Sequence, residues 1–157
     1  MRTLSKKTQY SLRALYSLAR SHRAGPRLIV DLAEQESIPK KFLEQILLGL
    51  KSAGFVESKK GRHGGYSLAR NPSEITLGEV IRRMEGPLAP LPCASETAYR
   101  KCDECADAET CGTRMVMREV RDATALILDG TTLADVCARI EQAQGQKADA
   151  DALMYYI

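Results

Sequence analysis

Apolar residues at helical spacing dominate the first half of the chain. They predict an amphipathic helix over 5–21, which ends before the Gly-Pro pair at 25–26. The apolar stripe of this helix is Leu12, Leu15, Tyr16 and Ala19. Two shorter helices are predicted over 29–36 and 40–52, the second starting after Pro39, a residue tolerated in a first helical turn. Two short helices joined by a tight turn are typical of a helix-turn-helix, although generic three-helix packing would give the same pattern.

The next segment favours the helix-turn-helix over that alternative. Two short strands are predicted over 55–58 and 65–68, joined as a hairpin by 59–64, which reads Lys-Lys-Gly-Arg-His-Gly. This loop has no apolar side chain to pack, and its composition suits a wing that lies on DNA phosphates and reaches a minor groove. A fourth helix is predicted over 76–84. The expected fold is mainly α with a small β-hairpin wing, a winged helix-turn-helix joined to a long dimerisation helix.

The second half begins with a long loop without helical or strand period, which is functional or disordered in most compact proteins. A long helix is then predicted over 110–128 and another over 132–142. The first carries an apolar seam at spacings of four, three and four, which suits pairing with a twin helix or burial in a monomeric core. The seam residues are Val116, Val120, Ala123 and Ile127. We expect four segments: 1–86 as the DNA-binding domain, 87–110 as a cysteine-rich sensor loop, 111–142 as dimerisation helices, and 143–157 as a flexible tail.

Charge also divides the chain into a basic first part and an acidic second part. Residues 1–70 hold 14 Lys and Arg against 5 Asp and Glu, whereas 71–157 hold 9 against 15. A basic module joined to an acidic one suggests that the first half meets a polyanion. The hydrophobic content of 44% and charged content of 27% are those of a globular protein, and the absence of tryptophan implies an aliphatic core.

Several classes of protein are disfavoured. No apolar run of about 18 residues is present to span a bilayer, and basic residues interrupt any signal-peptide core in the first twenty positions, so we expect a cytoplasmic protein. No Ser/His/Asp set, phosphate-cradling glycine loop or carboxylate pair indicates an enzyme. A thiol oxidoreductase built on Cys102 and Cys105 would need a thioredoxin-like βαβ unit, which the sequence does not supply.

Several segments together resemble a known family, the Rrf2-type winged-helix regulators, which include IscR, NsrR and CymR. The resembling segments are LSKKTQYSLRAL, PKKFLEQILLGLKSAGFVES, KKGRHGGYSLAR, ITLGEVIRRMEGPLAP, VMREVRDAT and TTLADV. The resemblance covers nearly the whole chain. It implies a homodimeric transcription factor, a repressor that binds a palindromic site in double-stranded DNA and is not an enzyme. One departure is Ser37, which stands where the turn of such motifs usually carries glycine.

The resemblance also implies which residues touch DNA. Glu44 and Gln45 would read bases, since a carboxylate can accept from cytosine and an amide can pair with adenine. The alternative for Glu44 is an exposed helical charge. The other expected DNA-binding residues are Lys40, Lys41 and Phe42 in the recognition segment and Lys59, Lys60, Arg62 and His63 in the wing.

Four cysteines cluster between the two halves, and in a chain without an export signal this favours a metal, cluster or redox site. They are Cys93, Cys102, Cys105 and Cys111. The iron–sulfur sensors of the family carry three cysteines here, which Cys93, Cys105 and Cys111 match, and Cys102 is extra. Arg114 occupies the position of the family's histidine ligand and cannot replace it.

Three kinds of site therefore remain open. They are an all-thiolate [2Fe–2S] or [4Fe–4S] cluster, a zinc ion, and a thiol switch between Cys102 and Cys105. The protein would then sense iron–sulfur or redox status, or cysteine supply. The fifth cysteine, Cys137, is expected to be a small core residue.

The chain ends with Tyr155, Tyr156 and Ile157, an ending that resembles that of CymR-type members. The tail of those proteins binds O-acetylserine sulfhydrylase, so the resemblance implies the same partner here. A terminal carboxylate on Ile157 can mimic an amino-acid substrate. The alternative is an apolar terminus that packs on its own dimer.

Overall fold

The first helix is the hub of the structure, a computed structural model that describes residues 4–154. Helix α1 (Lys6–Arg20) contacts α2, α3, α4, α6 and β2. Its apolar face packs into an aliphatic core, with Leu15 and Leu18 buried in it and Tyr16 and Ala19 partly buried at its edge. Ser5 caps the helix, its Oγ accepting a hydrogen bond from the Thr8 N–H at 3.2 Å. The predicted helix and aliphatic core are confirmed.

Helices α2 (Ile29–Glu36) and α3 (Lys40–Ser52) form the predicted helix-turn-helix. Ser37 ends α2 in the left-handed region, with φ of 51°, which is the conformation for which glycine is usual at this turn. The Ile38 N–H then donates to the Ala33 carbonyl at 2.9 Å and closes the turn. A serine can adopt this conformation at a cost of about 1 kcal/mol.

The hairpin is tied to the link between α1 and α2. Strands β1 (Val56–Lys59) and β2 (Gly65–Leu68) are antiparallel. Arg27 adds a short bridge on Tyr66, with two backbone hydrogen bonds of 2.8 Å. Gly65 makes this approach possible, because it has a φ of +143° and a Cβ there would lie 2.4 Å from the Arg27 carbonyl oxygen.

The remaining elements link the winged domain to two long helices. The short turns η1 (Pro72–Glu74) and η2 (Pro92–Ala94) flank α4 (Leu77–Glu85), and α5 (Gly112–Asp129) and α6 (Leu133–Met154) follow. The turn between α5 and α6 docks on the start of α4. There, the Leu77 N–H donates to the Thr131 carbonyl and the Leu133 N–H donates to the Ile75 carbonyl, both at 2.9 Å.

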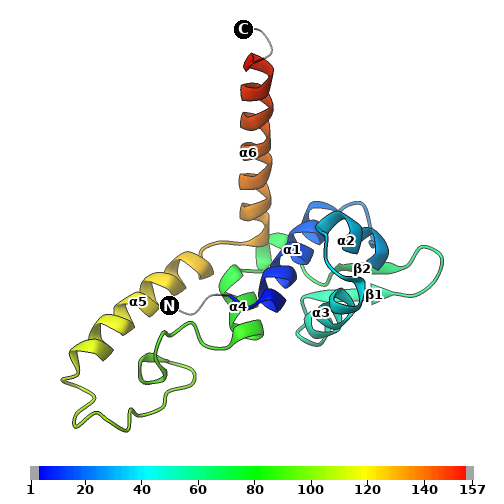
Figure 1. Cartoon of the computed structure of the whole chain (residues 1–157). Coiled ribbons are helices and arrows are strands. Elements are labelled where there is room, and N and C mark those ends of the chain that lie inside the picture. Colours follow the sequence, from blue (N-terminus) through cyan, green and yellow to red (C-terminus); the bar gives the residue numbers. More distant parts are fainter. Residues whose placement is uncertain (1–3, 155–157) are drawn as a thin grey trace.

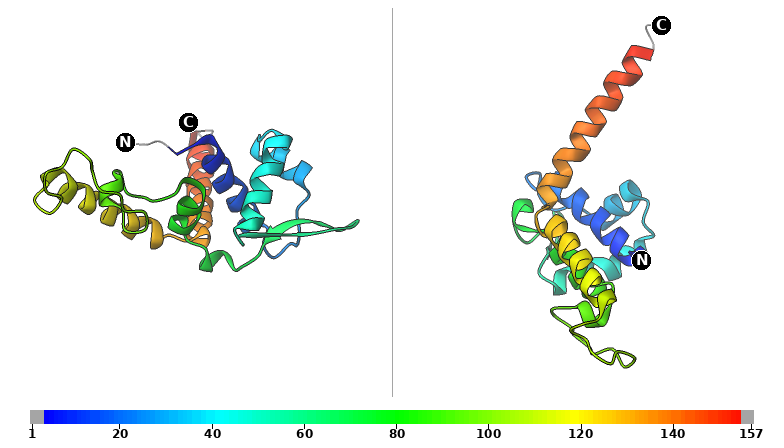
Figure 2. Two further views of the ribbon diagram at one scale, coloured as in Figure 1. Left: turned by 90° about the horizontal axis from the view of Figure 1, so that it is seen from below. Right: turned by 90° about the vertical axis from the view of Figure 1, so that its left-hand side faces the viewer.

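The molecule is elongated (Figure 1). The hairpin loop lies at one end and the loop that precedes α5 at the other, as Figure 1 and the left view of Figure 2 show. Helix α6 projects away from the body between them. No helix of the described residues 4–154 has both the length and the apolar character to cross a membrane.

The end of the last helix predicted at 142 is wrong, and 143–154, expected to be part of a flexible tail, is helical. Helix α6 does not end at 142 but continues to Met154. The segment holds four alanines and two glutamines, which are good helix formers, and it extends a helix already nucleated where Leu133 is buried. The low hydrophobicity of this segment is typical of disorder. A helix whose side chains face water, as those of 141–148 do, needs no apolar face to bury.

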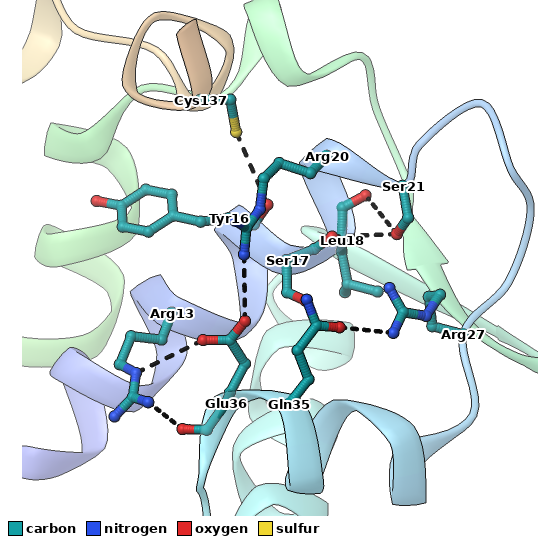
Figure 3. A network of polar contacts seen from close by, with 10 residues as sticks. All are labelled: Arg13, Tyr16, Ser17, Leu18, Arg20, Ser21, Arg27, Gln35, Glu36 and Cys137. Atoms are coloured by element: carbon teal, nitrogen blue, oxygen red, sulfur yellow. Dashed lines mark hydrogen bonds and ion pairs between the residues drawn. The ribbon is translucent and has the colours of Figure 1, made fainter. Parts of the chain in front are cut away.

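Polar contacts fix α1 against the helix-turn-helix (Figure 3). The largely buried Glu36 carboxylate pairs with Arg13 at 3.6 Å and Arg20 at 3.3 Å, and Arg13 also donates to the Glu36 carbonyl. Nearby, Cys137 of α6 is buried with its thiol 3.7 Å from the Tyr16 carbonyl oxygen, as expected of a small core residue.

Candidate nucleic-acid interface and cysteine loop

One face of α3 is open to solvent and carries the predicted base-reading residues. Lys40, Lys41, Glu44 and Gln45 are all exposed, while Leu43 on the other face is fully buried. The burial of one face orients the helix, and it leaves these polar side chains free to meet a partner. No ion pair ties them to another residue within 4–154.

Phe42 differs from its neighbours in the recognition segment. Its side chain is half-buried and packs edge-on against the Tyr10 ring of α1, with centroids 5.7 Å apart. The structure thus gives Phe42 a packing contact that the sequence prediction did not include.

The hairpin loop carries the other expected DNA-binding residues. The side chains of Lys59, Lys60, Arg62 and His63 are exposed, and none makes a hydrogen bond or ion pair to another described residue. A Cβ on Gly64 would lie 2.2 Å from the Lys59 carbonyl oxygen, so the loop folds closely on itself. The result is a compact cationic tip whose charges are not neutralised within this part of the chain.

The hairpin is held against α3. Lys51 in the last turn of α3 donates to the Ser58 hydroxyl of β1 at 2.6 Å. The open face of α3 and the basic hairpin therefore belong to one surface unit. Two neighbouring elements of this kind suit the major groove and the adjacent backbone of a duplex.

At the other end of the molecule, three of the four clustered cysteines lie close together. The Cys105 thiol lies 3.8 Å from the Cys111 sulfur. Hydrogen bonds with Cys102 and then Cys111 raise the pKa of Cys105 to about 12. Hydrogen bonding from the Arg114 backbone N–H, then from Cys105, lowers the pKa of Cys111, the N-cap of α5. Cys105 thus donates a hydrogen bond to the Cys111 sulfur, and this bond favours the thiolate form of Cys111.

Arg114 holds the two ends of the cysteine loop together. Its Nε donates to the Cys93 carbonyl at 2.9 Å and a terminal nitrogen donates to the Ala108 carbonyl at 3.0 Å. Its guanidinium also lies 5.8 Å from the centre of the Tyr99 ring. Cys93 is buried, and Arg114 ties its backbone to the first turn of α5.

A second arginine, one heptad later, anchors the same loop. Arg121 is buried and donates to the Ala94 carbonyl at 2.6 Å, with Glu96 at 3.1 Å from its guanidinium. The structural roles of both arginines were not among the predictions from the sequence. The sequence signal that could have indicated these roles is the seven-residue spacing, which places both arginines on the side of the helix opposite the apolar seam.

The apolar seam of α5 is open in the single chain. Ile127 is 67% exposed and Val116 is 52% exposed, while Val120 is half-buried and Ala123 exposed. Leu126 beside the seam is 78% exposed. Contiguous exposed apolar side chains on a long helix mark an interaction surface.

The thiols match a metal or cluster in chemical type, but their arrangement is incomplete. Within the described residues, no three or more Cys, His, Asp or Glu side chains stand in a metal-holding arrangement. Ligation by all four cysteines would therefore require this loop to close around the metal. The predicted partner-binding residues Tyr155, Tyr156 and Ile157 lie outside the described residues.

Comparison with known proteins gives consistent similarities. A family model named Rrf2, described as an iron-dependent transcriptional regulator, matches residues 4–139. CymR of Bacillus subtilis is 32% identical over 98% of this chain and 99% of its own length. NsrR of Geobacillus kaustophilus is 33% identical over 85% of this chain and 88% of its own.

Solved structures agree with these sequence similarities. The structure of CymR, the global cysteine regulator of B. subtilis, superposes with a TM-score of 0.74 at 32% identity, covering 88% of this chain and 98% of the other. IscR of T. potens gives 0.72 at 33% identity, covering 91% of both chains. The fold predicted from the sequence is therefore confirmed.

The basic hairpin generates the first prediction. Replacing Lys60 and Arg62 by alanine should weaken binding to every duplex sequence, because phosphate contacts carry no base information. The slope of log affinity against log salt should fall by about one for each phosphate that is no longer neutralised. Fluorescence anisotropy over a salt series measures both quantities. A matched variant, Lys101→Ala with Lys147→Ala, removes two charges elsewhere and should retain the slope; equal slopes in both variants would contradict the wing assignment.

Proposed function

This chain belongs to the Rrf2 family of transcriptional regulators, and we propose that it is a homodimeric DNA-binding repressor whose cysteine loop senses iron–sulfur or redox status. Family members are helix-turn-helix regulators and not enzymes. The observation that carries the proposal is the pairing of an exposed polar face on α3 with an adjacent, unneutralised cationic hairpin. In this proposal α3 enters the major groove, with Glu44 and Gln45 reading bases and the lysines on phosphates.

Dimerisation follows from the seam on α5. Two copies that pair their α5 helices would bury Val116, Val120, Ala123 and Ile127 and remove exposed apolar surface from water. A two-fold dimer would place two winged domains for a palindromic operator in double-stranded DNA.

The sensor would be a cluster held by Cys93, Cys102, Cys105 and Cys111. The family includes iron–sulfur sensors, and thiolates are the usual cluster ligands. A bound cluster would supply redox and nitric-oxide-sensitive chemistry to the loop. Arg114 stands where a histidine ligand is expected from the resemblance, and its contacts position the loop rather than supply a donor. Zinc in a four-thiolate site is the second occupant, and the close thiols also suit a disulfide switch.

In this proposal, helix α5 transmits a change at the cysteine loop to the DNA-binding domain. Arg114 and Arg121 attach the loop to one side of this helix, and its seam lies on the other. At its far end, Asp129 forms a two-pronged ion pair with Arg82 of α4, at 2.6 and 2.8 Å. A change at the cysteines would therefore shift α5 against its twin and alter the spacing of the two DNA-binding domains.

A CymR-like role is the second candidate, because that relative is similar along nearly the whole chain. In that case cysteine supply would be sensed through a complex with O-acetylserine sulfhydrylase, made by Tyr155, Tyr156 and Ile157. Residues 141–148 of α6 are exposed, and this helix, which precedes the proposed partner-binding residues, projects away from the body.

The dimer proposal predicts that Ile127→Glu weakens self-association. A carboxylate in the buried seam would lose hydration on both sides of the two-fold axis, so we expect the dimer dissociation constant to rise about a hundred-fold. Sedimentation equilibrium measures it. Arg118→Glu places the same charge at an exposed position off the seam and should stay dimeric. A dimeric Ile127→Glu protein would show that another surface pairs the chains.

The sensor proposal predicts that Cys111→Ala loses visible absorbance and bound iron after anaerobic purification while remaining folded and dimeric. The reason is that one thiolate ligand is removed at the start of α5. Cys137→Ala, which alters a buried cysteine of α6, should retain both signals. Stoichiometric zinc without iron in the parent protein would reject the cluster and retain the ligands. A protein with neither metal would favour the thiol switch.

The tail hypothesis predicts binding to purified O-acetylserine sulfhydrylase that disappears when Ile157 is deleted. The enzyme's amino-acid substrate should compete, because the terminal carboxylate would occupy its pocket. Calorimetric titration measures the interaction, and the deleted protein should still dimerise and bind DNA. Absence of heat at tens of micromolar, or heat that survives the deletion, rejects this partner.

A further inference from the structure

Helix α3 carries one large apolar side chain, that of Leu48, on its solvent-exposed polar face. Leu48 is 61% exposed, whereas the other leucines and the isoleucine of this helix are buried. It does not belong to the aliphatic core of the described residues. A single exposed leucine is ordinary on a protein surface, so its meaning depends on what it lies beside.

Leu48 lies on the same stripe as the predicted base-reading residues. Lys41, Glu44, Gln45 and Leu48 follow the spacing i, i+3, i+4 and i+7, which places them on one helical face. In homeodomains, the side chains that read bases in the major groove follow this same spacing along the recognition helix. Leu48 therefore extends the reading face by one helical turn.

The occupant of this face is set by its charge. Two lysines stand at its start, and the cationic hairpin is joined to α3 by the Lys51–Ser58 hydrogen bond. Such a surface attracts a polyanion and disfavours an apolar protein partner. Within a DNA groove, the one base feature that an aliphatic side chain recognises is the C5-methyl group of thymine, which projects into the major groove.

We propose that Leu48 is a specificity-determining residue that recognises a thymine methyl group in each operator half-site. The inference rests on the proposed placement of α3 in the major groove and adds an apolar contact to the polar ones of Glu44 and Gln45. Leu48 selects thymine by burying its own exposed surface against the methyl group, a gain that cytosine and the purines do not offer.

The test removes the methyl group and nothing else. The full-length, anaerobically purified protein first selects its preferred duplex from a random library. Each thymine of that duplex is then replaced singly by deoxyuridine, and the affinity is measured for the wild type and for Leu48→Ala. For the wild type, we expect one position in each half-site where uracil weakens binding about four-fold, the effect of one buried methyl group.

The variants assign that effect to Leu48. Leu48→Ala should bind the parent duplex more weakly and lose the uracil penalty at that position alone, while Leu48→Met should retain it. Val30→Ala is the matched control, because Val30 is also an exposed aliphatic residue, 44% exposed, but belongs to α2 and not to the α3 stripe; its truncation should leave every uracil penalty unchanged. The melting temperature of each of these variants should equal that of the wild type, because the substituted residues are exposed.

The outcomes separate this inference from the function on which it rests. Uracil penalties that persist in Leu48→Ala, or a selected half-site without a critical thymine, overturn the role of Leu48 and leave DNA recognition intact. Loss of uracil discrimination in Val30→Ala as well would also overturn it. A wild type that selects no sequence rejects the proposed function, and the inference with it.

Discussion

The burial of α1 is the constraint on which the rest of the structure depends. Leu15 and Leu18 are almost completely removed from water, and each buried leucine contributes about 1.5–3 kcal/mol. Because α1 contacts the helix-turn-helix on one side and α6 on another, the same core orients both. The Glu36 ion pairs help to orient α2 against α1, because they join α1 to the end of α2 just before the turn. Helices α3 and α6 are therefore positioned by one aliphatic core.

The two faces of α5 differ in what they contact, and this difference is the geometric basis of the proposed coupling between the cysteine loop and the winged domain. Arg114 and Arg121 bind loop carbonyls on one face, while the apolar seam is open on the other. The end of the helix is fixed to α4 by Arg82 and Asp129, and this pairing lowers the pKa of the Asp129 carboxyl. Because this ion pair is exposed to solvent, it contributes little to the free energy of folding. Its role is to fix the position of the end of α5 against α4.

Arg114 shows how a departure from a family pattern can be informative. At the position of a histidine ligand, an arginine cannot donate to a metal, yet its planar group spans two carbonyls and lies over Tyr99. The loop is thus organised by a side chain that supplies no metal ligand itself. In the same manner Ser37 adopts the left-handed turn usually given to glycine, and the motif persists.

The sequence by itself determined the helices, the hairpin and the aliphatic core, because hydrophobic period, caps and turn residues are local signals. It also indicated the seam of α5 and the cysteine cluster, both of which are spacing patterns. It could not decide whether α6 ended at 142, because a polar, alanine-rich segment is compatible with either coil or helix and only its continuity with a packed turn selects the helix. Nor could it show that Phe42 packs on Tyr10, that Arg114 and Arg121 hold the loop, or that Leu48 stays exposed. Those facts depend on which surfaces meet in three dimensions, and residues far apart in the chain decide them.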